Sequence, residues 1–179
     1  MRIISERAMS QAELDSRDDQ ADSISLHQAP VLLRRTIELL HSQHPHEPAH
    51  IVRQYQFLAW PDHSVPDKPD SLLGLMRLVH TETASSRDAP TIVHCSAGIG
   101  RTGTHILVDA VSTFLHRVRH LVEKEATSPQ VKYWHSPDDL IFEALMVMRE
   151  QRMSTVETVR QYVFAYKAVI ASLPPPSVP

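Results

Sequence analysis

The sequence is poor in glycine and nearly devoid of cysteine. It has only four glycines in 179 residues, where average usage gives roughly a dozen. Its single cysteine, Cys95, excludes an internal disulfide and a cysteine-based zinc site. The sequence has no apolar run of the roughly 18 residues that a transmembrane helix needs. The opening residues also lack the apolar stretch of a secretory signal, so we expect a cytoplasmic protein.

The charge balance argues against a further class of function. The formal net charge is −3 and the pI is near 6.4, so we expect no nucleic-acid partner and no membrane partner. Residues 1–30 hold three Arg and six Asp/Glu, and this difference of −3 equals the whole net charge. We therefore predict a polar, acidic and largely disordered leader over residues 1–30. A globular domain would span 31–172, followed by a proline-rich tail over 173–179.

Hydrophobic periodicity predicts strands that alternate with helices, and hence an α/β fold with a twisted mixed sheet flanked by helices. Residues 31–40 fit a strand or a short helix equally well. Residues 51–60 alternate with a period of two, and the apolar run 91–95 has the pattern of a central strand buried on both faces. Helices are predicted over 70–83 (capped by Asp70), 104–124, 136–152 (capped by Ser136) and 154–172 (with Ser154 and Glu157 as a capping box).

Three of the four glycines are clustered within six residues, at Gly98, Gly100 and Gly103. They belong to the string TIVHCSAGIGRTGT, in which a strand is predicted to end at His94, a tight loop to follow and a helix to begin near Thr102. Successive backbone N–H groups in such a loop form a nest for an anion, and the helix N-terminus adds partial positive charge. The string therefore predicts an anion-binding loop.

Cys95 begins this loop and Arg101 ends it. A thiol beside inward-facing amides at a helix N-terminus has its pKa lowered from about 8.5 toward roughly 3.5–7.5, which makes it a nucleophile at neutral pH. The Arg101 fork suits two phosphate oxygens, and the Thr102 hydroxyl can donate to the thiolate. A lone cysteine is more often a small buried hydrophobe, but its coincidence with Arg101 and the glycines favours a reactive phosphate site.

The string HCSAGIGRTG resembles the signature of the protein tyrosine phosphatases, in which His-Cys is followed by five residues, Arg and Ser or Thr. Two further segments resemble the same family in its order. Residues 60–66 resemble its mobile acid loop, and residues 158–166 resemble the start of its glutamine-bearing helix. The resemblance covers about residues 31–171 and implies a phosphatase-like core of strand, phosphate loop and helix. The acid loop and the last helix point to the phosphotyrosine-specific branch.

The resemblance also implies a role for each matching residue. Cys95 would be the nucleophile, Asp62 the general acid, and Arg101 a holder of the phosphate. The phosphate would also be bound by Ser96, Ala97, Gly98, Ile99, Gly100 and Gln161, with His94, Thr102, Trp60 and Glu157 in support. The implied reaction requires no metal or cofactor, and its partner would be a phosphotyrosine-containing protein.

The sequence departs from the family pattern in length and at three positions. The N-terminal part of the usual catalytic domain is not matched, including a Lys-Asn-Arg-Tyr loop that walls the phosphotyrosine pocket. Serines stand at Ser64 and Ser154 where the family has glycine, and Glu157 stands where it usually has Gln. Glu157 then either positions the hydrolytic water or is only the N3 acid of a capping box. The alternative functions are an impaired phosphate-binding module and a dual-specificity phosphatase.

Overall fold

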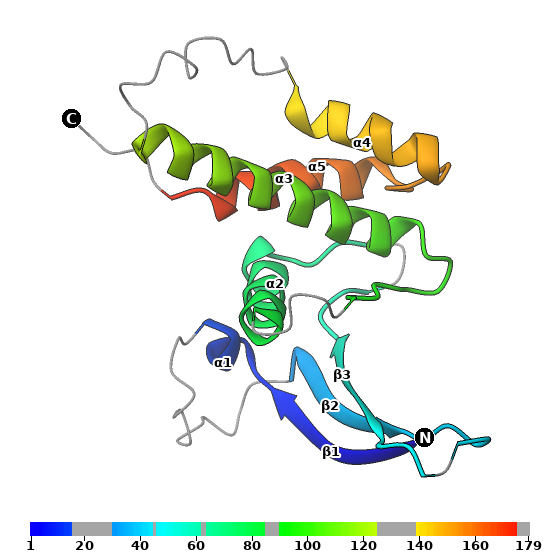
Figure 1. The fold of residues 1–179 in the computed structure, drawn as a ribbon. Coiled ribbons are helices and arrows are strands. Elements are labelled where there is room, and N and C mark those ends of the chain that lie inside the picture. Colours follow the sequence, from blue (N-terminus) through cyan, green and yellow to red (C-terminus); the bar gives the residue numbers. More distant parts are fainter. Residues whose placement is uncertain (16–29, 45, 62–63, 85–89, 125–138, 175–179) are drawn as a thin grey trace.

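The helices and strands of the chain are arranged on two sides of one central helix, α2. The computed structural model describes residues 1–15, 30–44, 46–61, 64–84, 90–124 and 139–174. In order, its elements are β1 (Arg2–Met9), α1 (Gln11–Asp15), β2 (Leu32–Leu39), β3 (His50–Phe57), α2 (Pro69–Thr83), α3 (Gly100–Lys124), α4 (Leu140–Gln151) and α5 (Val159–Ser172). The sheet lies on one side of α2, whereas α3, α4 and α5 lie on the other (Figure 1).

The described sheet has three strands in the order β1-β2-β3, and both pairs are antiparallel. The α/β class is thus confirmed, but this sheet is antiparallel and not mixed as predicted. The ambiguous residues 31–40 form β2, and the alternating residues 51–60 contain β3. The strand register places Arg35 of β2 opposite Gln54 of β3, and the Arg35 guanidinium donates to the Gln54 side chain over 3.0 Å.

The predicted disordered leader is wrong for its first part, because β1 and α1 lie within it. Its charged side chains pair across the sheet with charges on β2. Arg2 forms an ion pair with Glu38 at 2.7 Å, and Glu6 pairs with Arg35. Composition alone indicated disorder since it cannot show that these charges face partners on another strand. Residues 16–29 of the predicted leader lie outside the described residues.

Two helix starts differ from their predicted positions. Helix α2 begins at Pro69 after Lys68, so Asp70 lies in its first turn and is not the cap. Helix α4 is capped by Asp139, whose carboxylate accepts a hydrogen bond from the Phe142 N–H at 2.9 Å. The predicted cap Ser136 lies outside the described residues. Helix α2 thus starts at a proline without a side-chain cap, whereas α4 has the capping carboxylate of Asp139.

Residues 91–95 do not form the buried central strand that we predicted. They have no regular secondary structure, and the Ile92 side chain is 84% exposed. A central strand needs strands on both sides to bond its backbone groups, and the described sheet consists of β1, β2 and β3 alone. Among the described residues, this apolar segment therefore has no neighbouring strands that would bury it.

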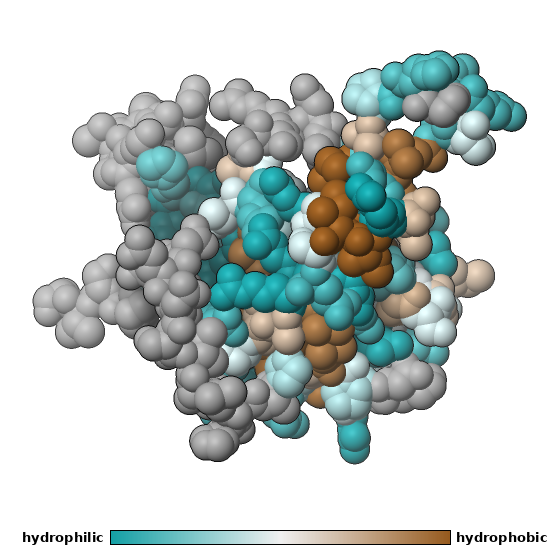
Figure 2. Space-filling view, turned by 90° about the horizontal axis from the view of Figure 1, so that it is seen from below, coloured by the Kyte–Doolittle hydropathy of each residue, from teal (hydrophilic) through white to brown (hydrophobic). Residues whose placement is uncertain are grey.

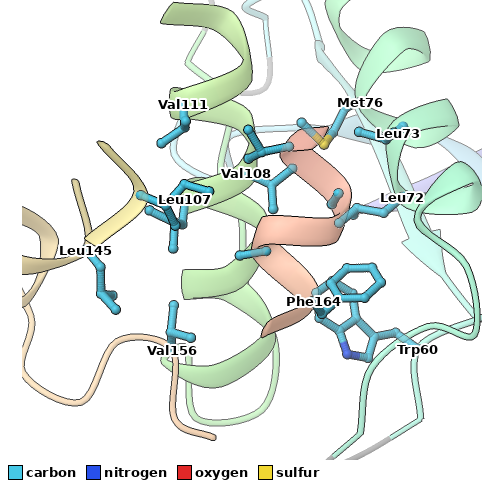
Figure 3. Packing of buried hydrophobic residues seen from close by; sticks show 14 residues of the cluster. Trp60, Leu72, Leu73, Met76, Leu107, Val108, Val111, Leu145, Val156 and Phe164 are labelled. Atoms are coloured by element: carbon cyan, nitrogen blue, oxygen red, sulfur yellow. The ribbon is translucent and has the colours of Figure 1, made fainter. Parts of the chain in front are cut away.

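The main core lies where α2, α3 and α5 meet, with contributions from α4 (Figure 3). Trp60 joins this core and is only 7% exposed. Its ring lies 5.8 Å from that of Phe164 on α5 and 6.3 Å from that of Phe57 on β3. A second cluster joins the sheet to α1 and α2, through Met9, Leu14, Leu32 and Leu75. The segment containing Trp60 is thus anchored to the helical layer.

One end of the sheet carries apolar side chains that the described residues leave exposed. Figure 2, viewed from the sheet side, shows brown apolar residues gathered within a mostly hydrophilic surface. The exposed apolar residues of the first two strands and their flanks are Met1, Ile3, Ile4, Leu39 and Leu40, and Ile51 begins the third strand beside them.

Candidate functional site

The glycine-rich loop leads directly into α3, which begins at Gly100 and not at the predicted residue 104. Gly98 has a φ of 71°, in the left-handed region that glycine adopts without steric cost. At the end of the loop, the Ile99 carbonyl accepts hydrogen bonds from the N–H groups of Gly103, at 3.0 Å, and Val156, at 3.2 Å. The loop is therefore held both by its own helix and by a segment far along the chain.

The Cys95 sulfur lies at the N-terminus of α3, where backbone amides point toward it. The Gly98 N–H donates to Cys95 Sγ over 3.2 Å. Partial burial raises the pKa of the Cys95 thiol, but hydrogen bonds from the Thr102 hydroxyl and from the N–H groups of Thr102, Gly98 and Ile99 outweigh it and lower the pKa. The predicted stabilisation of a thiolate thus agrees with the geometry of the loop.

The Thr102 hydroxyl is a major contributor to this stabilisation. Its oxygen is buried and makes no hydrogen bond of standard geometry within the described part of the chain, yet it lowers the pKa of the nearby Cys95 thiol. A buried hydroxyl without a partner is costly, so we assign the Cys95 sulfur as its acceptor. The sequence predicted this contact from the position of Thr102 directly after Arg101.

We expect Thr102→Val to raise the pKa of Cys95, because the variant keeps the side-chain shape and removes the donor. A hydrogen bond to a charged group contributes about 1.5–3 kcal/mol, so the thiolate fraction below the pKa falls by about tenfold or more. The rate of alkylation by iodoacetamide, measured against pH, then shifts to higher pH. Thr102→Ser keeps the hydroxyl and should give the same alkylation curve as the parent protein. If Thr102→Val also gives the parent curve, the assignment of Cys95 as the acceptor is wrong.

Arg101 connects the loop to the segment around Trp60. Its Nη1 donates to the Trp60 carbonyl over 3.4 Å. The Trp60 indole N–H in turn donates to the Ser64 carbonyl over 2.8 Å. Trp60 and Ser64 lie on either side of Asp62 in the predicted acid loop. These bonds therefore join the two residues to each other and join Trp60 to Arg101. Asp62 itself lies outside the described residues.

Residues 154–157, between α4 and α5, pack directly against the loop and the first turn of α3. A Cβ atom added to Gly103 would lie 2.5 Å from Thr155 Cγ2 and 2.8 Å from the Val156 nitrogen. Such distances leave no room for any side chain at that position. Gly103 is therefore needed for this close approach of two chain segments, a reason that differs from the left-handed backbone at Gly98.

Glu157 and Gln161 both reach the loop at Gly100. A Cβ atom there would lie 2.9 Å from Glu157 Oε2 and 2.9 Å from Gln161 Nε2. The predicted capping box of Ser154 and Glu157 is wrong, because α5 is capped by Thr158 and Gln161 in a reciprocal box. Glu157 precedes the helix, and its carboxylate lies against the loop. The structure therefore removes the capping interpretation of Glu157.

Ser154 occupies a backbone conformation that favours glycine, with a φ of 67°. We expect Ser154→Gly to stabilise the fold by about 0.5–1 kcal/mol, since a left-handed non-glycine residue costs about 1–2 kcal/mol and the added freedom of the unfolded chain offsets part of this. Urea unfolding at equilibrium measures the change. Ser154→Ala keeps the Cβ atom and should give no gain, and equal stability of all three proteins would refute the strain.

The remaining predicted site residues lie in or beside the loop. His94, Ser96 and Ala97 are exposed. The Nδ1 atom of His94 lies 3.5 Å from the Cys95 carbonyl oxygen. A cavity of about 440 Å³ adjoins the loop and is lined by Ile99, Arg149, Met153, Ser154, Val156 and Glu157. Within the described ranges no group of three His, Cys, Asp or Glu residues is arranged to hold a metal ion.

Two arginines beside the loop were not found from the sequence. Arg149 donates to the carbonyls of Thr155 and Val156, each over 3.0 Å. Arg152 donates through Nη2 to the Ala97 carbonyl over 3.1 Å. Basic residues near the C-terminus of a helix are common because they favour its dipole, so neither arginine gave a signal separable from that background.

Comparisons with known proteins agree with this geometry. A family model described as protein-tyrosine phosphatase matches residues 23–171. Human receptor-type tyrosine-protein phosphatase F is 40% identical over 120 residues, which is 66% of this chain and 5% of that protein. Chicken (Gallus gallus) receptor-type tyrosine-protein phosphatase S is 40% identical over 123 residues, which is 68% of this chain and 7% of that protein. The chain thus spans less than a tenth of these relatives. Each helix in the described part of the chain is too short or too polar to span a membrane.

Solved structures give the same result at the level of the fold. The catalytic domain of human protein tyrosine phosphatase non-receptor type 18 matches with a TM-score of 0.59 and 27% identity, covering 95% of this chain and 47% of that one. A Trypanosoma cruzi protein tyrosine phosphatase matches with a TM-score of 0.55 and 29% identity, covering 79% and 40%. With the family model matching most of its length, the chain belongs to the protein-tyrosine phosphatase family.

Proposed function

We propose that this chain hydrolyses phosphotyrosine in proteins through a cysteinyl-phosphate intermediate. The observation that carries the proposal is the Cys95 sulfur, which accepts the Gly98 N–H at 3.2 Å at the N-terminus of α3. Amides that stabilise a sulfur anion also suit the equatorial oxygens of a phosphate that the sulfur attacks. Arg101, six residues after Cys95, supplies the cationic fork at the other end of the same loop.

The reaction has two steps. Cys95 Sγ attacks phosphorus in line, the S–P bond forms and the P–O bond to tyrosine breaks, while Asp62 gives its proton to the tyrosine oxygen. Water then attacks the same phosphorus, Asp62 takes a proton from it, and inorganic phosphate leaves as the thiolate is regenerated. We propose that Gln161 and Glu157, which face the loop at Gly100, position this water.

A phosphate-binding module without turnover is the second candidate. It is favoured by the exposed Ile92, because no strand in the described part of the chain flanks the segment before Cys95 and holds the loop rigidly. Weaker support of the loop reduces its preorganisation, on which transition-state stabilisation depends more than simple anion binding does.

Steady-state hydrolysis of an aryl phosphate, with vanadate as competitor, separates the two candidates. Turnover that vanadate inhibits supports the phosphatase, and faster turnover of phosphotyrosine than of phosphothreonine peptides supports the narrower specificity. The binding module is supported if there is no turnover and if inorganic phosphate protects Cys95 against alkylation. If the protein shows neither turnover nor protection of Cys95, both candidate functions are overturned.

A further inference from the structure

Arg152 contacts the anion-binding loop at a peptide unit whose N–H donates to the Cys95 sulfur. It follows α4 directly, in extended conformation, and its backbone N–H bonds to the Met148 carbonyl. Its guanidinium donates through Nη2 to the Ala97 carbonyl over 3.1 Å. The same Nη2 lies 3.2 Å from the place that a Cβ atom on Gly98 would occupy. The contact therefore joins residues 55 positions apart in the sequence.

The Ala97 carbonyl and the Gly98 N–H belong to the same peptide bond. The described chain contains no cis peptide bond, and the C=O and N–H of a planar trans peptide point in opposite directions. Arg152 therefore binds this plane from one side, while the Cys95 sulfur accepts the N–H from the other at 3.2 Å. A bond that fixes the direction of the carbonyl necessarily fixes the direction of the N–H.

The Ala97–Gly98 peptide is free to rotate unless a contact holds it. Gly98 has a φ of 71°, and glycine visits positive and negative φ about equally readily. Rotation of the Ala97–Gly98 plane would turn the N–H away from the sulfur and present the carbonyl oxygen to it. A charged donor on the carbonyl opposes this rotation, and by polarising the peptide it also strengthens the N–H as a donor.

We propose that Arg152 is a positioning residue, which locks the Ala97–Gly98 peptide with its N–H directed at Cys95. The inference rests on the proposed function, in which that N–H stabilises the thiolate and then a phosphate oxygen. Arg152 does not touch the sulfur in this arrangement. It acts through one peptide plane of the loop.

The test compares Arg152→Ala, Arg152→Lys and the parent by the pH dependence of Cys95 alkylation. The chain has one cysteine, so iodoacetamide reports on this thiol alone. Loss of one charge-assisted hydrogen bond should shift the alkylation curve of Arg152→Ala to higher pH and lower the rate at its acid end by about three- to tenfold. Arg152→Lys keeps a charged donor and should recover part of the loss.

A matched control and a change of salt separate this lock from a general effect of charge. Arg117→Ala removes the same side chain from an exposed position further along α3, about 24 Å from Arg101 at 1.5 Å per helical residue. It should leave the alkylation curve unchanged. The effect of Arg152→Ala should persist in 0.5 M NaCl, because screening weakens distant charges more than a direct hydrogen bond.

The outcomes distinguish this inference from the proposed function. An Arg152→Ala curve that coincides with the parent curve overturns the inference and leaves the phosphatase proposal standing. If the Arg152→Ala curve is shifted but the parent protein hydrolyses no aryl phosphate, the positioning role of Arg152 is supported and the proposed phosphatase activity is refuted. A parent thiol that titrates like free cysteine overturns both. Thermal unfolding of each variant, followed by circular dichroism, shows whether the loop is changed within an intact fold.

Discussion

Replacing Cys95 by serine is expected to abolish hydrolysis of an aryl phosphate, with a loss of at least about 10⁴-fold in kcat. The reason lies in the acidity of the attacking group. Against the effect of burial, hydrogen bonds from the Thr102 hydroxyl and from the amides of Thr102, Gly98 and Ile99 lower the pKa of the thiol, which favours the thiolate. A serine hydroxyl is a far weaker acid, so the same donors leave it protonated and unreactive. Release of phosphate, measured in single turnover and at steady state, gives the loss.

The same variant should still bind phosphate esters, because the loop amides and Arg101 remain in place. A labelled phosphotyrosine peptide, titrated against Cys95→Ser and monitored by fluorescence anisotropy, measures this binding. Competition by inorganic phosphate shows that the site is the anion-binding loop. Hydrolysis that persisted in Cys95→Ser would eliminate a cysteinyl-phosphate mechanism, whereas loss of both turnover and peptide binding, with the fold intact, would show that the sulfur itself carries anion affinity.

Replacing Asp62 by alanine is expected to lower kcat for a phosphotyrosine peptide by about 10²–10⁴-fold, the usual contribution of a general acid. A phenolate ion is a poor leaving group at neutral pH, and protonation as the P–O bond breaks removes that barrier. Binding of the peptide should change little, since Asp62 is assigned to proton transfer and not to the phosphate. Kinetics with two leaving groups provide the sharpest measurement, because an electron-poor nitrophenol needs less help from the acid.

The expected loss is therefore larger for tyrosine phosphate than for a nitrophenyl phosphate. Asp67→Ala is a matched control, since Asp67 is an exposed carboxylate on the same loop region and precedes α2. It should retain the parent kcat with both substrates. Equal losses with both leaving groups in Asp62→Ala would contradict a role as acid, and a parent-like kcat would assign proton transfer to another group.

The loop around Cys95 was predictable from the sequence because its interactions are local. The Gly98 donor is three residues from Cys95, and Thr102 is seven residues from it. A glycine cluster that opens a helix specifies such a nest through backbone geometry that needs no distant partner. The resemblance named Trp60 only as a supporting residue, and the structure shows that it lies in the core.

Other parts of the sequence were misread because their outcome depends on distant partners. The acidic leader was predicted to be disordered, but Arg2 and Glu6 of its first part form ion pairs with Glu38 and Arg35 of β2. The apolar residues 91–95 looked like a buried strand, yet no described strand lies beside them to accept their backbone bonds. Two segments could cap α5, and the reciprocal bonds of Thr158 and Gln161 decided between them.

By itself, the sequence determined the family and the place of the single sulfur in a loop of backbone donors, since a short loop and the helix that follows it form within nine residues, from Cys95 to Gly103. Only the tertiary structure decided what surrounds the loop. Packing of residues 154–157 against Gly100 and Gly103, and of Arg152 against Ala97, joins segments more than fifty residues apart. Such contacts leave no local pattern in a sequence, because they form only when α3, α4 and α5 pack on a common core.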